Sequence, residues 1–264
     1  MSKETSFRII SLVPSLTETL CDFGLLPHLV GCTSFCTEPK ALRTQVVAVG
    51  GTKDASVDEI LALKPTHIVV NTEENTSATI ATLKRLSAEN NFRVIETFLD
   101  KPEDNFTTVQ YLSRIFLFQD AAEKWCIEAR VKLNKLVHKI GVIPEFSYIY
   151  FIWMNPWMVA GNQTYISRCL ELIGGKNAIN TGNEPTERYP VFETESLKKQ
   201  QPNVCLFSSE PYPFRTRHIE KFEQDAKIKI PTLKVDGQAL SWYGSRFTKT
   251  ISYLELLREK IDEI

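Results

Sequence analysis

The sequence predicts an α/β protein of two pseudo-symmetric lobes with mainly parallel sheets, joined by a single long backbone helix, with a ligand cleft between the lobes. Strand-like and helix-like stretches alternate along both halves, a long helical period lies in the middle, and one helix–proline–strand pattern occurs in each half. We expect the lobes to span residues 1–117 and 144–264, with the linking helix over residues 118–143.

The first lobe is predicted from four short runs rich in β-branched residues, which alternate with helix-like stretches as in βαβ units. These runs are Ile9–Val13, Val46–Val49, His67–Val70 and Phe92–Thr97.

The first helix of this lobe is expected directly after its first strand. Ser15 and Glu18 have the spacing of a capping box, and Gly24 is the expected stop.

The linking helix is the longest periodic segment. It follows a helix over about residues 102–116, begins near Asp120 and ends near Gly141. Its apolar positions recur at helical spacing: Trp125, Ala129, Leu133, Leu136 and Ile140.

The second lobe is predicted from strands at Phe146–Trp153, Asn203–Phe207 and Thr232–Val235 and from a final helix over about residues 246–264. The two lobes share a local pattern, because Asp58–Val70 matches Glu195–Phe207 without a gap as a short helix, a proline and a buried strand. Ligands of open α/β sheets bind beyond the carboxyl ends of the strands, so the expected site is the cleft between the lobes.

The charge balance and hydropathy exclude several classes of partner. Thirty-one basic and thirty-two acidic residues give a net charge near zero, so no nucleic-acid partner is expected, and no apolar stretch approaches the length of a transmembrane helix. As written, the sequence has no secretion signal, which favours a cytoplasmic protein. A periplasmic or lipid-anchored protein requires that a leader was removed or that the start lies upstream. We expect a monomer.

The six cysteines lie mostly in apolar patterns and are interpreted as buried thiols rather than a disulfide framework. Cys32 and Cys36 form a C-x3-C pair, but a structural zinc site needs a second pair of ligands, and none is nearby. We therefore predict no metal site.

No catalytic residue or cofactor is predicted. The sequence lacks a nucleophile elbow, a phosphate loop, a dinucleotide fingerprint and a zinc-protease motif, and its four histidines are scattered. An enzyme built on such a cleft remains an alternative, with Glu38, Glu73, Glu74 and Arg246 as its few titratable candidates.

Aromatic and thioether side chains are concentrated in residues 153–162, directly after a strand, which favours a large, partly apolar ligand. Trp157 and Trp242 are expected to contact it, whereas Trp153, closer to the strand, is expected to behave more like core. The alternative is that Trp153 and Trp157 both cover the core. Further candidate loops are residues 34–39, 189–190 and 241–246.

The sequence resembles the helical-backbone metal-chelate receptors, the class III periplasmic binding proteins, over nearly its whole length. The segments that carry the resemblance are residues 10–18, 49–52, 63–65, 155–161 and 241–246. It is most similar to the cobalamin-binding branch. This resemblance implies a substrate-binding protein of an ABC-type importer that binds a corrinoid and docks on a permease. A ferric-siderophore or haem receptor, or a cytosolic carrier or sensor of such a ligand, is the alternative.

The resemblance also implies site residues. Phe35 and Tyr189 match aromatic ligand contacts and Met158 replaces a phenylalanine, whereas Thr52 and Asn71 replace tryptophans and Gln238 replaces an aspartate. The expected ligand-binding set is Pro14, Ser15, Phe35, Cys36, Thr52, Asn71, Trp153, Asn155, Trp157, Met158, Tyr189, Gln238, Trp242 and Tyr243. Asp58 and Glu195, equivalent in the internal repeat, match the carboxylates that dock on the permease. Stabilisation of a helix N-terminus is the alternative role for both.

Overall fold

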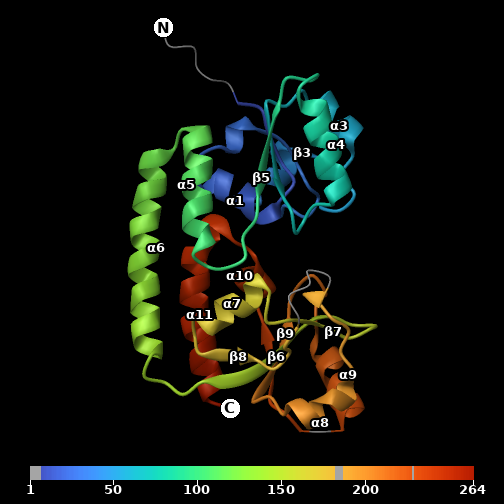
Figure 1. Ribbon diagram of the computed structural model, residues 1–264, viewed down its shortest axis with the longest axis vertical. Helices are drawn as coiled ribbons and strands as arrows, with labels where there is room; N and C mark the ends of the chain where they lie inside the picture. The colour runs from blue at the N-terminus through green and yellow to red at the C-terminus, as the bar shows by residue number, and fades with distance from the viewer. Residues whose placement is uncertain (1–6, 182–186, 228) are drawn as a thin grey trace. The chain divides into compact units, whose positions relative to one another are not determined.

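The computed structural model describes residues 7–181, 187–227 and 229–264 (Figure 1). Its contacts divide the chain into two compact units. Unit 1 comprises Met1–Leu99, Asp104–Cys126 and Tyr243–Arg246, and unit 2 comprises Asp100–Glu103, Ile127–Trp242 and Phe247–Ile264. The two-lobe α/β architecture predicted from the sequence is confirmed.

The described part of unit 1 contains a five-stranded parallel sheet in the order β3-β2-β1-β4-β5. Its strands are β1 (Ile9–Ser11), β2 (Leu29–Cys32), β3 (Val47–Ala48), β4 (His67–Asn71) and β5 (Arg93–Thr97). Strand β2, which contains a glycine, was not predicted from the sequence. A Cβ at Gly31 would lie 2.9 Å from Leu63 Cδ1, so a larger residue in this strand would have to displace the side chain of Leu63.

Helices cover both faces of this sheet. Figure 1 shows α1 (Pro14–Asp22) and α5 (Asp104–Phe116) on one side, and α3 (Val57–Ala62) and α4 (Ser77–Ser87) on the other. The short α2 (Leu42–Gln45) precedes β3.

Helix α1 does not begin as expected. Its N-cap is Val13, which makes no side-chain hydrogen bond, and Pro14 occupies the first turn, so the predicted capping box of Ser15 and Glu18 is wrong. Proline is favourable at this position, because a backbone N–H in the first turn would have no acceptor within the helix and its absence costs no hydrogen bond. The predicted stop is confirmed, since Gly24 adopts a φ of +82° directly after the helix.

The described part of unit 2 contains a sheet in the order β10-β9-β6-β7, with β8 also paired to β6. Its strands are β6 (Phe146–Trp153), β7 (Met158–Ala160), β8 (Gly175–Asn177), β9 (Val204–Ser208) and β10 (Thr232–Val235). Only the β6–β7 pair is antiparallel among these named strands. The short β7 and β8 were not predicted, because three residues are too few to show a period.

The helices of unit 2 also lie on both sides of its sheet. In Figure 1, α7 (Tyr165–Glu171) and α11 (Phe247–Asp262) lie on one side, and α8 (Leu197–Gln200) and α9 (Thr216–Ala226) on the other. The short α10 (Gly237–Ser241) follows β10.

The predicted linking helix is α6 (Gln119–Ile140), which begins in unit 1 and ends in unit 2. Near its end, Lys139 Nζ contacts Glu255 Oε1 at 2.8 Å and Glu259 Oε1 at 2.9 Å, both on α11. Among the described residues, no helix combines the length and hydropathy needed to span a bilayer.

The internal repeat extends to the backbone. In one copy α3 precedes Pro65 and β4, and in the other α8 precedes Pro202 and β9. The residue before each proline adopts a left-handed conformation, with φ of 48° at Lys64 and 43° at Gln201. Neither residue is a glycine, so the same uncommon turn is kept in both copies.

Candidate functional site

Buried amides hold the loops at the carboxyl end of the unit 1 sheet. Asn75 Nδ2 donates to Leu12 O (3.0 Å) and to Thr52 O (2.9 Å), and Asn75 Oδ1 accepts from the backbone N–H of Asn71 (2.8 Å). The loops that follow β1, β3 and β4 are therefore fixed by one side chain. Asn71 itself is buried, and its Oδ1 accepts from the backbone N–H of Glu73 (2.8 Å).

A carboxylic acid lies at this edge with a tyrosine. The hydroxyl of Tyr243 donates to Glu74 Oε1 at 2.5 Å. Burial, together with the neighbouring Cys36 and Glu73, raises the pKa of Glu74 to about 7, against the hydrogen bond from Tyr243 and the charge of Lys53. Near neutral pH, Glu74 is thus partly protonated, and it can both donate and accept hydrogen bonds.

Tyr243 belongs to a four-residue segment, Tyr243–Arg246, that packs on α1. Arg246 Nε and Nη2 contact Glu18 Oε2 and Oε1 at 2.5 and 2.9 Å, and both side chains are largely buried. Ser245 Oγ donates to Asp22 Oδ2 at 2.7 Å. Arg246 and Glu18 form a structural pair and hold Tyr243 in place.

The backbone of this segment approaches α1 closely at Gly244. Its φ is +81°, and a Cβ at this position would lie 2.0 Å from Thr19 Oγ1. Only glycine satisfies both the conformation and the contact. The N–H of Gly244 donates to Asn105 Oδ1 at 2.5 Å, which also ties the segment to α5.

The loop after β2 presents an aromatic ring to solvent. Phe35 is 59% exposed, whereas Cys36 beside it is buried. A Cβ at Gly51 would lie 3.0 Å from Phe35 Cε2, so one edge of the ring rests on the loop after β3. An apolar ring that is held at one edge and otherwise open suits contact with a ligand.

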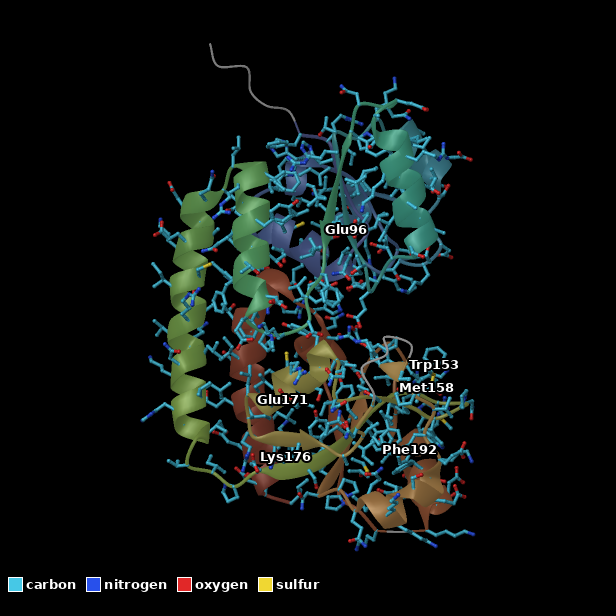
Figure 2. The ribbon with its side chains drawn as sticks, in the orientation of Figure 1. Glu96, Trp153, Met158, Glu171, Lys176 and Phe192 are labelled. Atoms are coloured by element: carbon cyan, nitrogen blue, oxygen red, sulfur yellow. The ribbon has the colours of Figure 1, made fainter. Side chains whose placement is uncertain are left out.

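The corresponding edge of unit 2 is aromatic. Trp153 ends β6, is 40% exposed and pairs in register with Met158 on β7. Figure 2 shows these two labelled side chains close together in unit 2. The ring of Tyr212 lies 5.5 Å from that of Trp153, edge to face. The structure therefore contradicts the expectation that Trp153 is core-like.

Trp157 is half-buried and packs against the core of unit 2 instead. Its ring stacks on Phe214 at 6.1 Å and contacts Phe222 edge to face at 5.4 Å and Phe151 at 5.9 Å. The roles expected for the two tryptophans are thus reversed in packing. The hairpin between β6 and β7 turns one tryptophan outward and the other inward.

A second carboxylic acid follows β9. Glu210 Oε1 accepts from Trp242 Nε1 at 2.7 Å and from Ser241 Oγ at 3.3 Å. Burial raises the pKa of Glu210, against the hydrogen bonds from Trp242, Ser241 and Gln238. Trp242 is 8% exposed, so its indole is largely fixed by this contact.

The other residues expected from the sequence fall on the same two edges. Within unit 1, Pro14 and Ser15 are buried in the first turn of α1, and Thr52 is half-buried after β3. Within unit 2, Asn155 is exposed in the β6–β7 hairpin. Tyr189 and Gln238 are both half-buried. Tyr189 lies just before the isolated bridge at Val191, and Gln238 lies at the start of α10. No expected residue falls outside the described ranges.

The two expected docking carboxylates are exposed. Asp58 lies in the first turn of α3, after the cap Ser56, whose hydroxyl accepts from the backbone N–H of Glu59. Glu195 lies in the 3-10 turn Thr194–Ser196 before α8. Their equivalence in the sequence repeat therefore holds in the local structure.

Sequence reasoning did not place Glu74 or Glu210 in the binding set. Glu73 and Glu74 were weighed only as titratable groups for an enzyme. The position of Glu210 could have been found from the internal repeat. Continued three residues past its ends, the ungapped repeat aligns Glu73, which follows β4, with Glu210, which follows β9. The contact of Glu74 with Tyr243 joins residues 169 apart and has no local signal.

Within residues 7–181, 187–227 and 229–264, no group of three or more His, Cys, Asp or Glu side chains is arranged to hold a metal ion. The carboxyl-end loops of each unit instead carry aromatic rings, amides and an acid with a raised pKa, which is Glu74 in unit 1 and Glu210 in unit 2. Such groups hold an organic molecule by packing and hydrogen bonds.

Comparison with known proteins identifies the family of the chain. A family model described as periplasmic binding protein matches residues 9–234. The vitamin B12-binding protein of Photorhabdus laumondii is 23% identical over 261 residues, which cover 97% of this chain and 88% of that protein.

Two solved structures share the fold. The periplasmic vitamin B12 binding protein of Vibrio cholerae superposes with a TM-score of 0.79 at 20% identity, covering 97% of this chain and 98% of that one. The periplasmic heme-binding protein of Roseiflexus sp. RS-1, in its apo form, gives a TM-score of 0.82 at 17% identity, covering 97% and 99%.

Proposed function

Because the chain belongs to the periplasmic binding protein family, we propose that it is a non-enzymatic solute-binding protein whose ligand is a corrinoid of the cobalamin type. The ligand contacts the carboxyl-end loops of both units. The observation that carries the proposal is the combination of exposed aromatic surface, at Phe35 and Trp153, with the partly protonated acid Glu74 and the half-buried acid Glu210.

The acids favour an amide-bearing ligand over a carboxylate-bearing one. A corrinoid has neutral amide side chains, which exchange hydrogen bonds with a carboxylic acid in either protonation state. Haem has propionates, which prefer arginine or lysine partners. The ionised forms of Glu74 and Glu210 would repel them, and Lys53 already donates to the carbonyl of Glu73 at 2.7 Å. A haem or ferric-siderophore ligand is therefore the second candidate.

Calorimetry against cobalamin, cobinamide, haem and a ferric siderophore tests the ligand class. We expect heat from the two corrinoids and no saturable heat from haem. Saturable binding of haem or the siderophore, without corrinoid binding, would replace the proposed ligand while keeping the receptor function. No binding of any of the four would contradict the proposal.

Alanine variants test the site. Phe35→Ala and Trp153→Ala should each weaken binding by roughly 1–3 kcal/mol, the scale of a lost aromatic contact, with little change in melting temperature. Tyr111→Ala is the matched control, because Tyr111 is an exposed aromatic residue on α5 rather than on a carboxyl-end loop. Equal effects of all three variants would contradict the assigned surface.

The proposed role is delivery to an ABC-type importer. Asp58 and Glu195, exposed and equivalent in the repeat, are the proposed contacts with the permease. In this role the protein would work on the outer side of the cytoplasmic membrane as a monomer. A cytosolic carrier or sensor would bind the same ligand without a permease, and co-reconstitution with a candidate permease distinguishes the two.

A further inference from the structure

Two thiols meet beneath the turn that follows β2. Cys32 is the last residue of this strand, and the backbone N–H of Cys36 donates to Thr33 O at 3.0 Å to close the turn. The two cysteine side chains are hydrogen-bonded to each other, and both are free thiols. The C-x3-C pair, which has too few ligands for a structural zinc site, thus brings two thiols close together.

The surroundings of the two sulfur atoms differ. Thr17 Oγ1 lies 3.2 Å and Thr33 Oγ1 lies 3.3 Å from Cys36 Sγ. The hydrogen bond with Cys32 lowers the pKa of Cys36, and the two threonine hydroxyls lower it further, against the effect of burial. The same hydrogen bond, with burial, raises the pKa of Cys32. Cys36 is therefore the thiol that ionises first, and Cys32 is its proton-bearing neighbour.

We propose that Cys32 and Cys36 form a reversible redox modification site, in which a small-molecule disulfide such as oxidised glutathione converts the two thiols into an intramolecular disulfide. The Cys36 thiolate attacks one sulfur of the glutathione disulfide, which forms a mixed disulfide and releases one glutathione thiolate. Cys32, after losing its proton to that thiolate, attacks Cys36 Sγ and releases the second glutathione. Two protein thiols are oxidised, and one glutathione disulfide is reduced to two glutathione molecules.

The turn gives the oxidant a route to Cys36. Both sulfur atoms are buried, but Ser34 and Phe35 between them are exposed. Opening of this short turn uncovers Cys36 without unfolding the sheet. By contrast, Cys169 and Cys205 lie in a helix and a strand, and burial raises their pKa values. The competitor is Cys21, half-buried and close enough to raise the pKa of Cys32.

Mass spectrometry of the native, full-length protein tests the proposal. The folded protein is incubated with reduced or oxidised glutathione, alkylated and digested with trypsin and chymotrypsin. Trypsin releases residues 9–40 with three of the cysteines, and chymotryptic cleavage after Phe23 and Phe35 puts Cys21, Cys32 and Cys36 on separate peptides. After oxidation we expect a peptide linked through Cys32 and Cys36, and two of the six cysteines should no longer react with the alkylating reagent. Dithiothreitol should restore both.

Two controls separate the pair from general thiol oxidation. Cys126→Ser should leave the linked peptide unchanged, whereas Cys32→Ser should stop at a mixed glutathione disulfide on Cys36. Independently, phenylarsine oxide, which bridges two adjacent thiols, should add once to the reduced wild type and protect Cys32 and Cys36 from maleimide. A link through Cys21, or full alkylation of Cys32 and Cys36 after oxidation, would overturn the proposal. The test needs no transported ligand, so it stands apart from the proposed function.

Discussion

The carboxyl-end loops of the two units are held by different forces. In unit 1, buried amides and a tyrosine fix the loops, as shown by the two carbonyls that Asn75 binds and by the contact of Tyr243 with Glu74. In unit 2, packed rings predominate, with Trp157 against Phe214 and Phe222, beside the hydrogen bond that Glu210 accepts from Trp242. Two units that share a helix–proline–strand repeat thus differ where the ligand is proposed to bind. The repeat preserves the strand and leaves the loop after it free to change.

The largest effect that would sharpen this comparison is expected in unit 2. Trp157→Ala should lower the free energy of unfolding by up to about 3–5 kcal/mol, because it removes a half-buried ring that packs against an aromatic core. Trp153→Ala, four residues away and 40% exposed, is the matched control and should cost far less. Chemical denaturation of both variants measures the difference. Equal losses would contradict the inward packing of Trp157.

The second prediction concerns pH and unit 1. The pKa of Glu74 is raised from 4.5 to about 7, so between these values the folded protein binds a proton that the unfolded chain has released. The stability from this group is therefore full below about pH 4.5, falls as the pH rises, and is lost above about pH 7. The change is at most about 3 kcal/mol.

Glu74→Gln should flatten the stability profile between pH 4.5 and 7, measured by urea unfolding at several pH values. Glu89→Gln, at an exposed glutamate, should keep the wild-type slope. If wild type and Glu74→Gln have the same slope, the raised pKa of Glu74 is refuted.

A smaller effect is expected from the amide that fixes the unit 1 loops. Asn75→Ala leaves the carbonyls of Leu12 and Thr52 without this donor and should cost roughly 1–3 kcal/mol. Asn90→Ala is the control, because Asn90 is exposed and its Nδ2 donates only to the local carbonyl of Leu86. Urea midpoints measure both. A neutral Asn75→Ala would mean that the unit 1 loops are not held by this side chain.

The smallest effect concerns the exposed carboxylates Asp58 and Glu195, which occupy equivalent positions of the repeat in the two units. Exposed ion pairs contribute roughly 0.2–1 kcal/mol each, so Asp58→Lys with Glu195→Lys should slow association with permease-containing vesicles and reduce its salt dependence. Ligand affinity should stay unchanged, and Glu89→Lys is a control at an exposed site. Unchanged association with slightly lower stability would assign both carboxylates to the helix N-termini instead.

The parts of the fold with a local period could be predicted from the sequence. Apolar spacing predicts helix α6, and the ungapped repeat predicts the equivalent strands β4 and β9. The three-residue β8 has no such signal, and the capping box at Ser15 failed because Pro14 already starts the helix. The spacing of apolar residues shows that a segment is helical. It does not show where the helix begins, because either a capping side chain or a proline can start the first turn.

The candidate site was less predictable. Phe35 was identified through the family resemblance, and its exposure agrees with a surface role. The packing of Trp153 and Trp157 was assigned in reverse, because the side chain that faces inward depends on the β6–β7 hairpin, which pairs Trp153 with Met158. The contact between Tyr243 and Glu74 depends on how the chain returns to unit 1, which no local pattern encodes.

That return has a consequence for the order in which the molecule is made. Ser245 contacts Asp22 across 223 residues, and Arg246 contacts Glu18 across 228. On the ribosome, the amino-terminal unit can form its sheet early, yet Glu74 and Glu18 wait for their partners until nearly all of the chain has been synthesised. During that interval, two carboxyl groups destined for burial are still hydrated. The nascent amino-terminal unit is therefore an incomplete domain, and translation of Tyr243–Arg246 supplies its last piece.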